Sequence, residues 1–162
     1  MKRLGRGLIL ALASCGFLSY LFPRLTSRGR RNTGSGLVGS IAGAATGMAL
    51  PSSAGAQVLF LLGGLFVSVA IADAAEKWMG EKDDSRIVID EWIGCLCAVA
   101  FLPRTWGTLV GGVILFRIFD VWKKPWIFRL ASLPGGWGVV MDDVLAGLYA
   151  NGILQLGRLL FS

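Results

Sequence analysis

Long apolar stretches constrain this chain more than any other feature of its sequence. The clearest covers residues 57–72, about 24 Å as an α-helix, and its apolar character continues toward residue 78. Further apolar segments cover residues 8–22, 36–51, 87–102, 107–122 and 139–161. The chain is 54% hydrophobic and only 16% charged, whereas soluble domains carry about 25% charged residues. We therefore expect an all-α fold, a compact helical bundle in a membrane.

Charged residues are distributed unevenly along the sequence. All ten acidic residues lie between Asp73 and Asp143, whereas residues 1–72 carry only basic charges. A basic N-terminal part suits the anionic cytoplasmic leaflet of a membrane. The basic residues interrupt apolar segments instead of lining a polar face, which argues against a nucleic-acid partner.

The first 22 residues resemble a signal peptide, because Lys2, Arg3 and Arg6 precede the apolar run over residues 8–22. No clean cleavage site follows that run, and arginines come directly after it. This pattern favours a retained helix that is embedded in the membrane or lies along its interface. We expect two parts: an N-terminal apolar segment with a basic loop over residues 1–34, and a helical domain over residues 35–162.

Carboxylates gather at the ends of three predicted helices, on one side of the membrane if the bundle is antiparallel with short loops. An acidic residue at membrane depth costs about 2.5 to 3.5 kcal/mol, so we interpret these residues as functional. The acidic residues at these helix ends are Asp90, Glu91, Asp120, Asp142 and Asp143, and Asp83 lies in the turn before the first of them. Their joint placement predicts an acidic site at helix ends on one face of the bundle.

Each acidic position also has a structural explanation when it is considered alone. Carboxylates at the start of a helix interact favourably with the helix dipole, which would explain Asp90 and Glu91. Asp142 and Asp143 would then cap the last helix. Arg117 lies three residues before Asp120, so these two would form an ion pair within the membrane.

The residue types narrow the chemistry of such a site. The chain has no histidine, which excludes histidine-based catalysis and histidine metal ligands, and we interpret its three cysteines as small apolar fillers. Clustered carboxylates favour a hard cation, and Mg²⁺ usually joins one or two carboxylates to a substrate phosphate. A carboxylate that is not bound to the metal would serve as a general base. Arg117 and Lys123 are the natural phosphate contacts.

Three segments, in this order, resemble the signature segments of the phosphatidylglycerophosphatase A family: EKDDSRIVIDEWIG, FRIFDVWKKPW and GGWGVVMDDVLAGLYA. The earlier SGLVGSIAG is similar to that family's glycine–serine segment. The resemblance covers most of residues 35–150. It implies a helical, Mg²⁺-dependent enzyme that hydrolyses the lipid phosphatidylglycerophosphate to phosphatidylglycerol and inorganic phosphate. It also implies a multi-pass protein of the cytoplasmic membrane with its active site on the cytoplasmic face.

The resemblance also assigns roles by position. It places the family's acidic residues on Asp83, Asp90, Glu91, Asp120, Asp142 and Asp143. We expect the last five of these around the metal and Asp83 nearby as a base or supporting group. The expected phosphate contacts are Arg117, Lys123, Ser40 and Gly39. Further family glycines fall on Gly135, Gly136 and Gly138, in a segment expected to form a glycine-dependent turn over residues 133–138.

Two alternatives stay open. A small membrane transporter or channel would use the same buried acids, together with Arg117, as a proton or cation path. Such a relay would distribute its acids through the membrane, whereas these cluster at helix ends. The other alternative is a paralogue of the family that has lost its activity.

Overall fold

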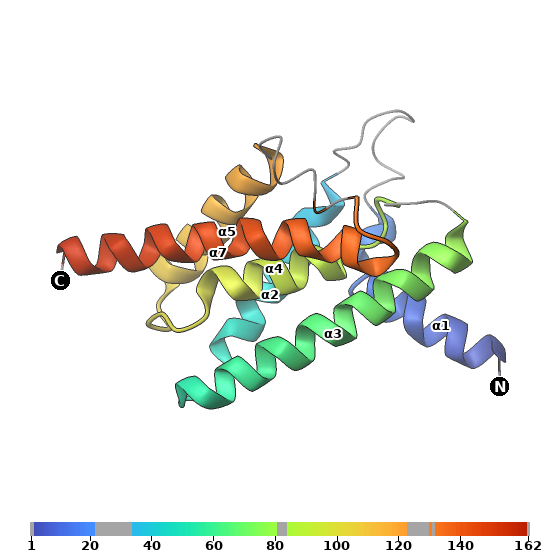
Figure 1. Ribbon diagram of the computed structural model, residues 1–162, viewed down its shortest axis with the longest axis horizontal. Coiled ribbons are helices and arrows are strands. Elements are labelled where there is room, and N and C mark those ends of the chain that lie inside the picture. Colours follow the sequence, from blue (N-terminus) through green and yellow to red (C-terminus); the bar gives the residue numbers. More distant parts are fainter. Residues whose placement is uncertain (1, 22–33, 81–83, 123–129, 131, 162) are drawn as a thin grey trace.

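The computed structural model describes residues 2–21, 34–80, 84–122, 130 and 132–161, and the structural statements below concern these residues. Helices and turns make up the described chain, with no β-strand in those ranges, so the all-α prediction is confirmed (Figure 1). The helices are α1 (Lys2–Ala13), η1 (Leu18–Leu21), α2 (Ser35–Met48), α3 (Ala54–Met79), α4 (Ile89–Val99), α5 (Trp106–Val121) and α7 (Gly136–Phe161).

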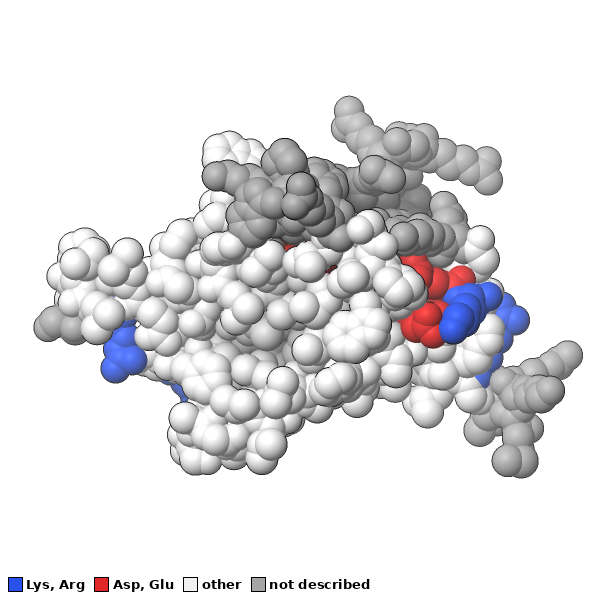
Figure 2. Space-filling view, viewed as in Figure 1, with Lys and Arg blue, Asp and Glu red and all other residues white. Residues whose placement is uncertain are grey.

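Two of the described helices, α3 and α7, are long and apolar enough to cross a membrane. Each has 26 residues, about 39 Å of helix, which exceeds the roughly 30 Å hydrocarbon core of a bilayer. Large apolar side chains stay exposed along both, such as Leu59 on α3 and Leu156 on α7. The described residues on the face shown in Figure 2 are largely uncharged between its two ends. These features support association with a membrane.

The shortest of the main helices, α4, forms the centre of the bundle. It packs against α2, α3, α5 and α7, and all of its residues except Glu91 and Trp92 are buried. Close contact depends on glycines in the neighbouring helices: a Cβ on Gly147 of α7 would collide with the backbone carbonyl of Gly94. Small residues of this kind let helix backbones approach one another. The helix that carries Asp90 and Glu91 is therefore also the core of the fold.

Two predicted helices are shorter in the structure than in the sequence pattern. The run over residues 8–22 breaks after Ala13, where Cys15 and Phe17 have positive φ angles of 48° and 65°. At about 18 Å, α1 is too short to span a bilayer. The helix predicted over residues 87–102 occupies only Ile89–Val99.

Distant side chains end α4 before Pro103, the next residue that would stop a helix. Phe101, with a φ of 62°, donates its backbone N–H to Gln57 Oε1 at 2.9 Å. Asn151 of α7 donates to the carbonyl oxygens of Ala98 and Ala100 at 3.0 and 2.7 Å. These side-chain amides form hydrogen bonds with backbone groups that would pair within α4 if the helix were longer.

The last helix begins earlier than the sequence suggests. It starts at Gly136 instead of residue 139, so the turn predicted over residues 133–138 is wrong in its second half. Only Gly135 there has a positive φ, of 59°. A Cβ on Gly136 would collide with the backbone of α3. This close packing against α3 accounts for the helical conformation of residues 136–138. Asp142 and Asp143 consequently lie beyond the first turn, and the capping explanation for them is wrong.

Candidate functional site

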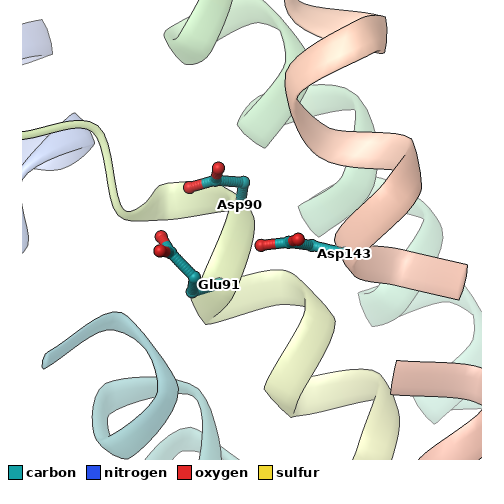
Figure 3. A group of neighbouring side chains, drawn as sticks. All are labelled: Asp90, Glu91 and Asp143. Carbon is teal, nitrogen blue, oxygen red and sulfur yellow. The ribbon is translucent and has the colours of Figure 1, made fainter. Parts of the chain in front are cut away.

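Three carboxylates meet at the beginning of α4. Asp90 and Glu91 stand in its first turn, and Asp143 extends toward them from α7 (Figure 3). One carboxylate oxygen from each residue lies within 4.8 Å of the others. Asp90 and Asp143 are buried, with relative exposures of 7% and 2%, and Glu91 is partly buried. We call Asp90, Glu91 and Asp143 the acid triad.

Backbone contact between α4 and α7 brings the acid triad together. A Cβ on Gly94 would lie only 2.7 Å from the carbonyl oxygen of Asp143, so a larger residue would force the helices apart. Because Gly94 follows Asp90 by one helical turn, the two residues lie on one face of α4. The glycine thus fixes the distance from which Asp143 reaches Asp90 and Glu91.

A cation from α5 lies beside the acid triad. Nη1 of Arg117 is 2.8 Å from Oδ2 of Asp120 and 3.8 Å from Oε1 of Glu91. The predicted Arg117–Asp120 ion pair is therefore present, and Arg117 also pairs with Glu91 of the acid triad. Asp120 is joined to the triad through Arg117 instead of being one of its three members.

The two aspartates of α7 face different directions. Adjacent residues on a helix point about 100° apart, so only Asp143 belongs to the acid triad. Asp142 is also buried, and its Oδ1 accepts the backbone N–H of Asp143 at 3.0 Å. That Asp142 and Asp120 bind a metal stays a prediction.

The electrostatics of the triad suit a cation. The pKa of Glu91 is raised to about 8, mainly by burial and also by the charges of Asp143 and Asp120, against a hydrogen bond from Asp90 and the charge of Arg117. Glu91 lies in α4, outside the two candidate membrane spans. Its Oε2 is buried and accepts no hydrogen bond from the described residues. A set of carboxylate oxygens, one of them buried and without a hydrogen bond from the described residues, fits a hard divalent ion such as Mg²⁺.

The predicted contacts on α2 are buried against the helix core. Ser40 donates its hydroxyl to the carbonyl of Gly36 at 2.8 Å, and a Cβ on Gly39 would collide with the carbonyl of Val88. Both residues thus have packing roles, and their contact with phosphate stays a prediction. Asp83 and Lys123 lie outside the described residues.

Sequence reasoning missed the support of the turn that leads into Asp90. Asp84 accepts the backbone N–H and Nε of Arg86 at 2.9 and 2.8 Å, and the same arginine also pairs with its second oxygen. Ser19 donates to the carbonyl of Arg86 at 2.6 Å, and Val88 donates its N–H to Ala13 at 2.8 Å. The Asp84–Arg86 spacing could have been noticed in the sequence, whereas the link to residues 13–19 could not.

The similarity to known proteins extends beyond these residues. The family model described as Phosphatidylglycerophosphatase A matches residues 14–158 of the 162. This chain belongs to the phosphatidylglycerophosphatase A family. The matched region includes the whole acid triad and Arg117, together with the residues from Ser14 onward that support the turn before Asp90.

Curated relatives come from three bacteria. Phosphatidylglycerophosphatase A of Escherichia coli (strain K12) is 36% identical over 59% of this chain and 57% of its own length. A Bacteroides thetaiotaomicron protein named "Putative phosphatidylinositol-3-phosphatase" is 36% identical over 66% of each chain. Phosphatidylglycerophosphatase A of Haemophilus influenzae is 35% identical over 72% of this chain and 78% of its own. The match thus spans less than two thirds of the first two relatives, and no solved structure matches the chain.

Proposed function

We propose that this protein is a phosphatidylglycerophosphatase, which hydrolyses phosphatidylglycerophosphate to phosphatidylglycerol and inorganic phosphate with the help of Mg²⁺. The observation that carries the proposal is the acid triad beside Arg117, in a chain of this family. Carboxylates without histidine or thiolate ligands suit Mg²⁺, and a guanidinium next to them suits a phosphate dianion.

In this proposal Asp90, Glu91 and Asp143 hold the metal. When bound, Mg²⁺ supplies charge stabilisation at a phosphoryl oxygen and acidifies a water molecule. Arg117 binds the remaining phosphate oxygens, and Asp120, 2.8 Å from its Nη1, holds the guanidinium in place. A carboxylate outside the metal set accepts a proton from the attacking water. The water oxygen bonds to phosphorus while the bond between phosphorus and the glycerol oxygen breaks, and the same carboxylate returns the proton to the glycerol oxygen.

The arrangement of the helices suits a substrate that is half in the membrane. The end of α3 and the start of α7 lie at the same end of the bundle as the start of α4, whose first turn carries Asp90 (Figure 1). A headgroup phosphate at the acid triad would therefore leave its acyl chains beside the exposed apolar side chains of α3 and α7. We propose that these helices cross the cytoplasmic membrane. The basic N-terminal part supports a site on the cytoplasmic face, where anionic lipids attract Lys and Arg.

The test is phosphate release by the purified full-length protein in detergent. We expect release from phosphatidylglycerophosphate with Mg²⁺ and none with EDTA, and we expect Asp90→Asn and Asp143→Asn to abolish it. Asp73→Asn is the matched control, because Asp73 pairs with Lys77 at 2.5 Å on α3 and is not part of the triad. Near-full turnover by Asp90→Asn would show that the metal assignment is wrong.

A second substrate belongs in the same assay because of the name of the Bacteroides relative. Phosphatidylinositol 3-phosphate also presents a phosphate monoester at a membrane surface, and the same triad could act on it. If kcat/KM is higher for this lipid than for phosphatidylglycerophosphate, the proposed substrate becomes the inositol lipid, and the proposed metal site stays the same.

A further inference from the structure

Four buried glycines line α2 where it packs on α4 and α5: Gly36, Gly39, Gly43 and Gly47. The atoms that a Cβ would meet differ among them. At Gly39 and Gly43 it would collide with backbone carbonyls, those of Val88 and Trp92. A backbone carbonyl cannot move without its helix, so these two glycines set the distance between α2 and α4.

Gly36 faces side-chain ends instead of backbone. A Cβ there would collide with Oε1 of Glu91, and it would lie 2.7 Å from Nη1 of Arg117 and 3.0 Å from Cδ of Glu91. These are the same two atoms that face each other across 3.8 Å in the Glu91–Arg117 ion pair. The acid of the triad and the cation beside it therefore meet over the bare Cα of Gly36.

We propose that Gly36 is a positioning residue for the active site, which holds open the space in which Glu91 and Arg117 meet. The inference rests on the proposed function, since it takes Glu91 as a metal ligand. A methyl group at this position pushes aside two flexible side-chain ends, so the helices keep their packing. Glu91 then moves relative to Asp90 and Asp143, and Arg117 moves relative to Asp120.

Gly47 provides a matched control on the same helix. A Cβ there would also meet a side chain, the Cγ2 atom of Val99 at 2.5 Å, but in an apolar cluster away from the acid triad. Gly36→Ala and Gly47→Ala thus both add one methyl group to a buried face of α2. Only the first touches the functional groups.

The experiment measures Mg²⁺ binding by calorimetry, together with thermal unfolding and phosphate release, for the full-length wild type and both variants. We expect Gly36→Ala to bind Mg²⁺ about 10- to 100-fold more weakly, as when a group that orients a metal ligand is lost. We expect Gly47→Ala to bind as the wild type does, and both to unfold cooperatively. Wild-type affinity in Gly36→Ala would overturn the inference, as would an equal loss in Gly47→Ala.

A folding failure would also be informative. If Gly36→Ala does not fold, the double variant Gly36→Ala/Glu91→Asp decides, because aspartate is shorter by one methylene and withdraws from the added methyl. Recovery of folding supports the positioning role, and continued failure overturns it in favour of plain helix packing. Since metal binding is measured without substrate, a wild type that binds Mg²⁺ but releases no phosphate would refute the proposed function alone.

Discussion

Replacing Asp143 with asparagine should stabilise the metal-free protein while it removes Mg²⁺ binding. The reason is that three carboxylates share a small, largely buried space and repel one another there. At an effective dielectric constant of about 20, two unit charges 4.8 Å apart repel by about 3.5 kcal/mol. Loss of the hydrogen bonds that Asp143 makes offsets part of this gain, at about 1 to 3 kcal/mol.

The size of the effect should depend on pH because Glu91 titrates. Mainly because of burial, its pKa is raised from 4.5 to about 8. Between these two pH values the folded state keeps a proton on Glu91, whereas the unfolded state has released it. Stability of the wild type in EDTA therefore falls as pH rises through this window. Asp143→Asn removes one of the charges that raise this pKa, so its advantage over the wild type grows with pH. Near pH 9 we expect a net gain of about 2 kcal/mol, or roughly 4 to 8 °C in the unfolding midpoint.

The assay is thermal unfolding in detergent, followed by circular dichroism, in EDTA and in Mg²⁺. At about 100 times its Kd, Mg²⁺ should stabilise the wild type by about 2.7 kcal/mol and the variant hardly at all, so their order reverses. Asp73→Asn should lose less than about 1 kcal/mol in either condition, because it breaks only a surface ion pair with Lys77. The reasoning is refuted if Asp143→Asn melts below the wild type in EDTA at high pH and Mg²⁺ stabilises both equally.

Three further predictions concern the pair, the packing and the turn around the site. Arg117→Lys should lower kcat/KM for the lipid by about 10-fold or more, because lysine lacks the planar fork that binds phosphate; unchanged kinetics of phosphate release would contradict this. Gly147→Ala should lower the free energy of unfolding by about 1 to 3 kcal/mol, because its methyl group meets a backbone carbonyl of α4. Gly152→Ala, with nothing within 4 Å, should raise it by up to about 1 kcal/mol, and equal unfolding midpoints for the two variants would rule the packing explanation out. Burial alone would raise the pKa of Asp84, but the hydrogen bonds and charge of Arg86 outweigh it and hold that pKa below 3.8. This stabilisation is lost as pH falls below the unfolded pKa of about 3.8, so below about pH 4 the wild-type unfolding midpoint should drop more steeply than that of Asp84→Asn.

Helix positions were predictable from the sequence where local pattern alone decides them. Apolar runs bounded by glycine or proline predicted α2, α3 and α5 to within a few residues, because burial of an apolar run and loss of a backbone donor are local effects. Helix ends that depend on distant groups were not predictable. The helix α4 ends early because Gln57 and Asn151 form hydrogen bonds with the backbone just after its last turn, and α7 begins early because Gly136 packs on α3.

For the candidate site, the sequence by itself determined which residues are available: two pairs of adjacent carboxylates, one arginine within an apolar helix and no histidine. Those residue types limit the chemistry to oxygen ligands and a phosphate-binding cation, whatever the geometry. The tertiary structure alone decided that Asp143 and not Asp142 joins Asp90 and Glu91, and that Asp120 is reached through Arg117. The physical reason is that helix rotation and spacing are set by contacts between backbones, at Gly94, Gly147 and Gly39, which no pattern within one helix specifies.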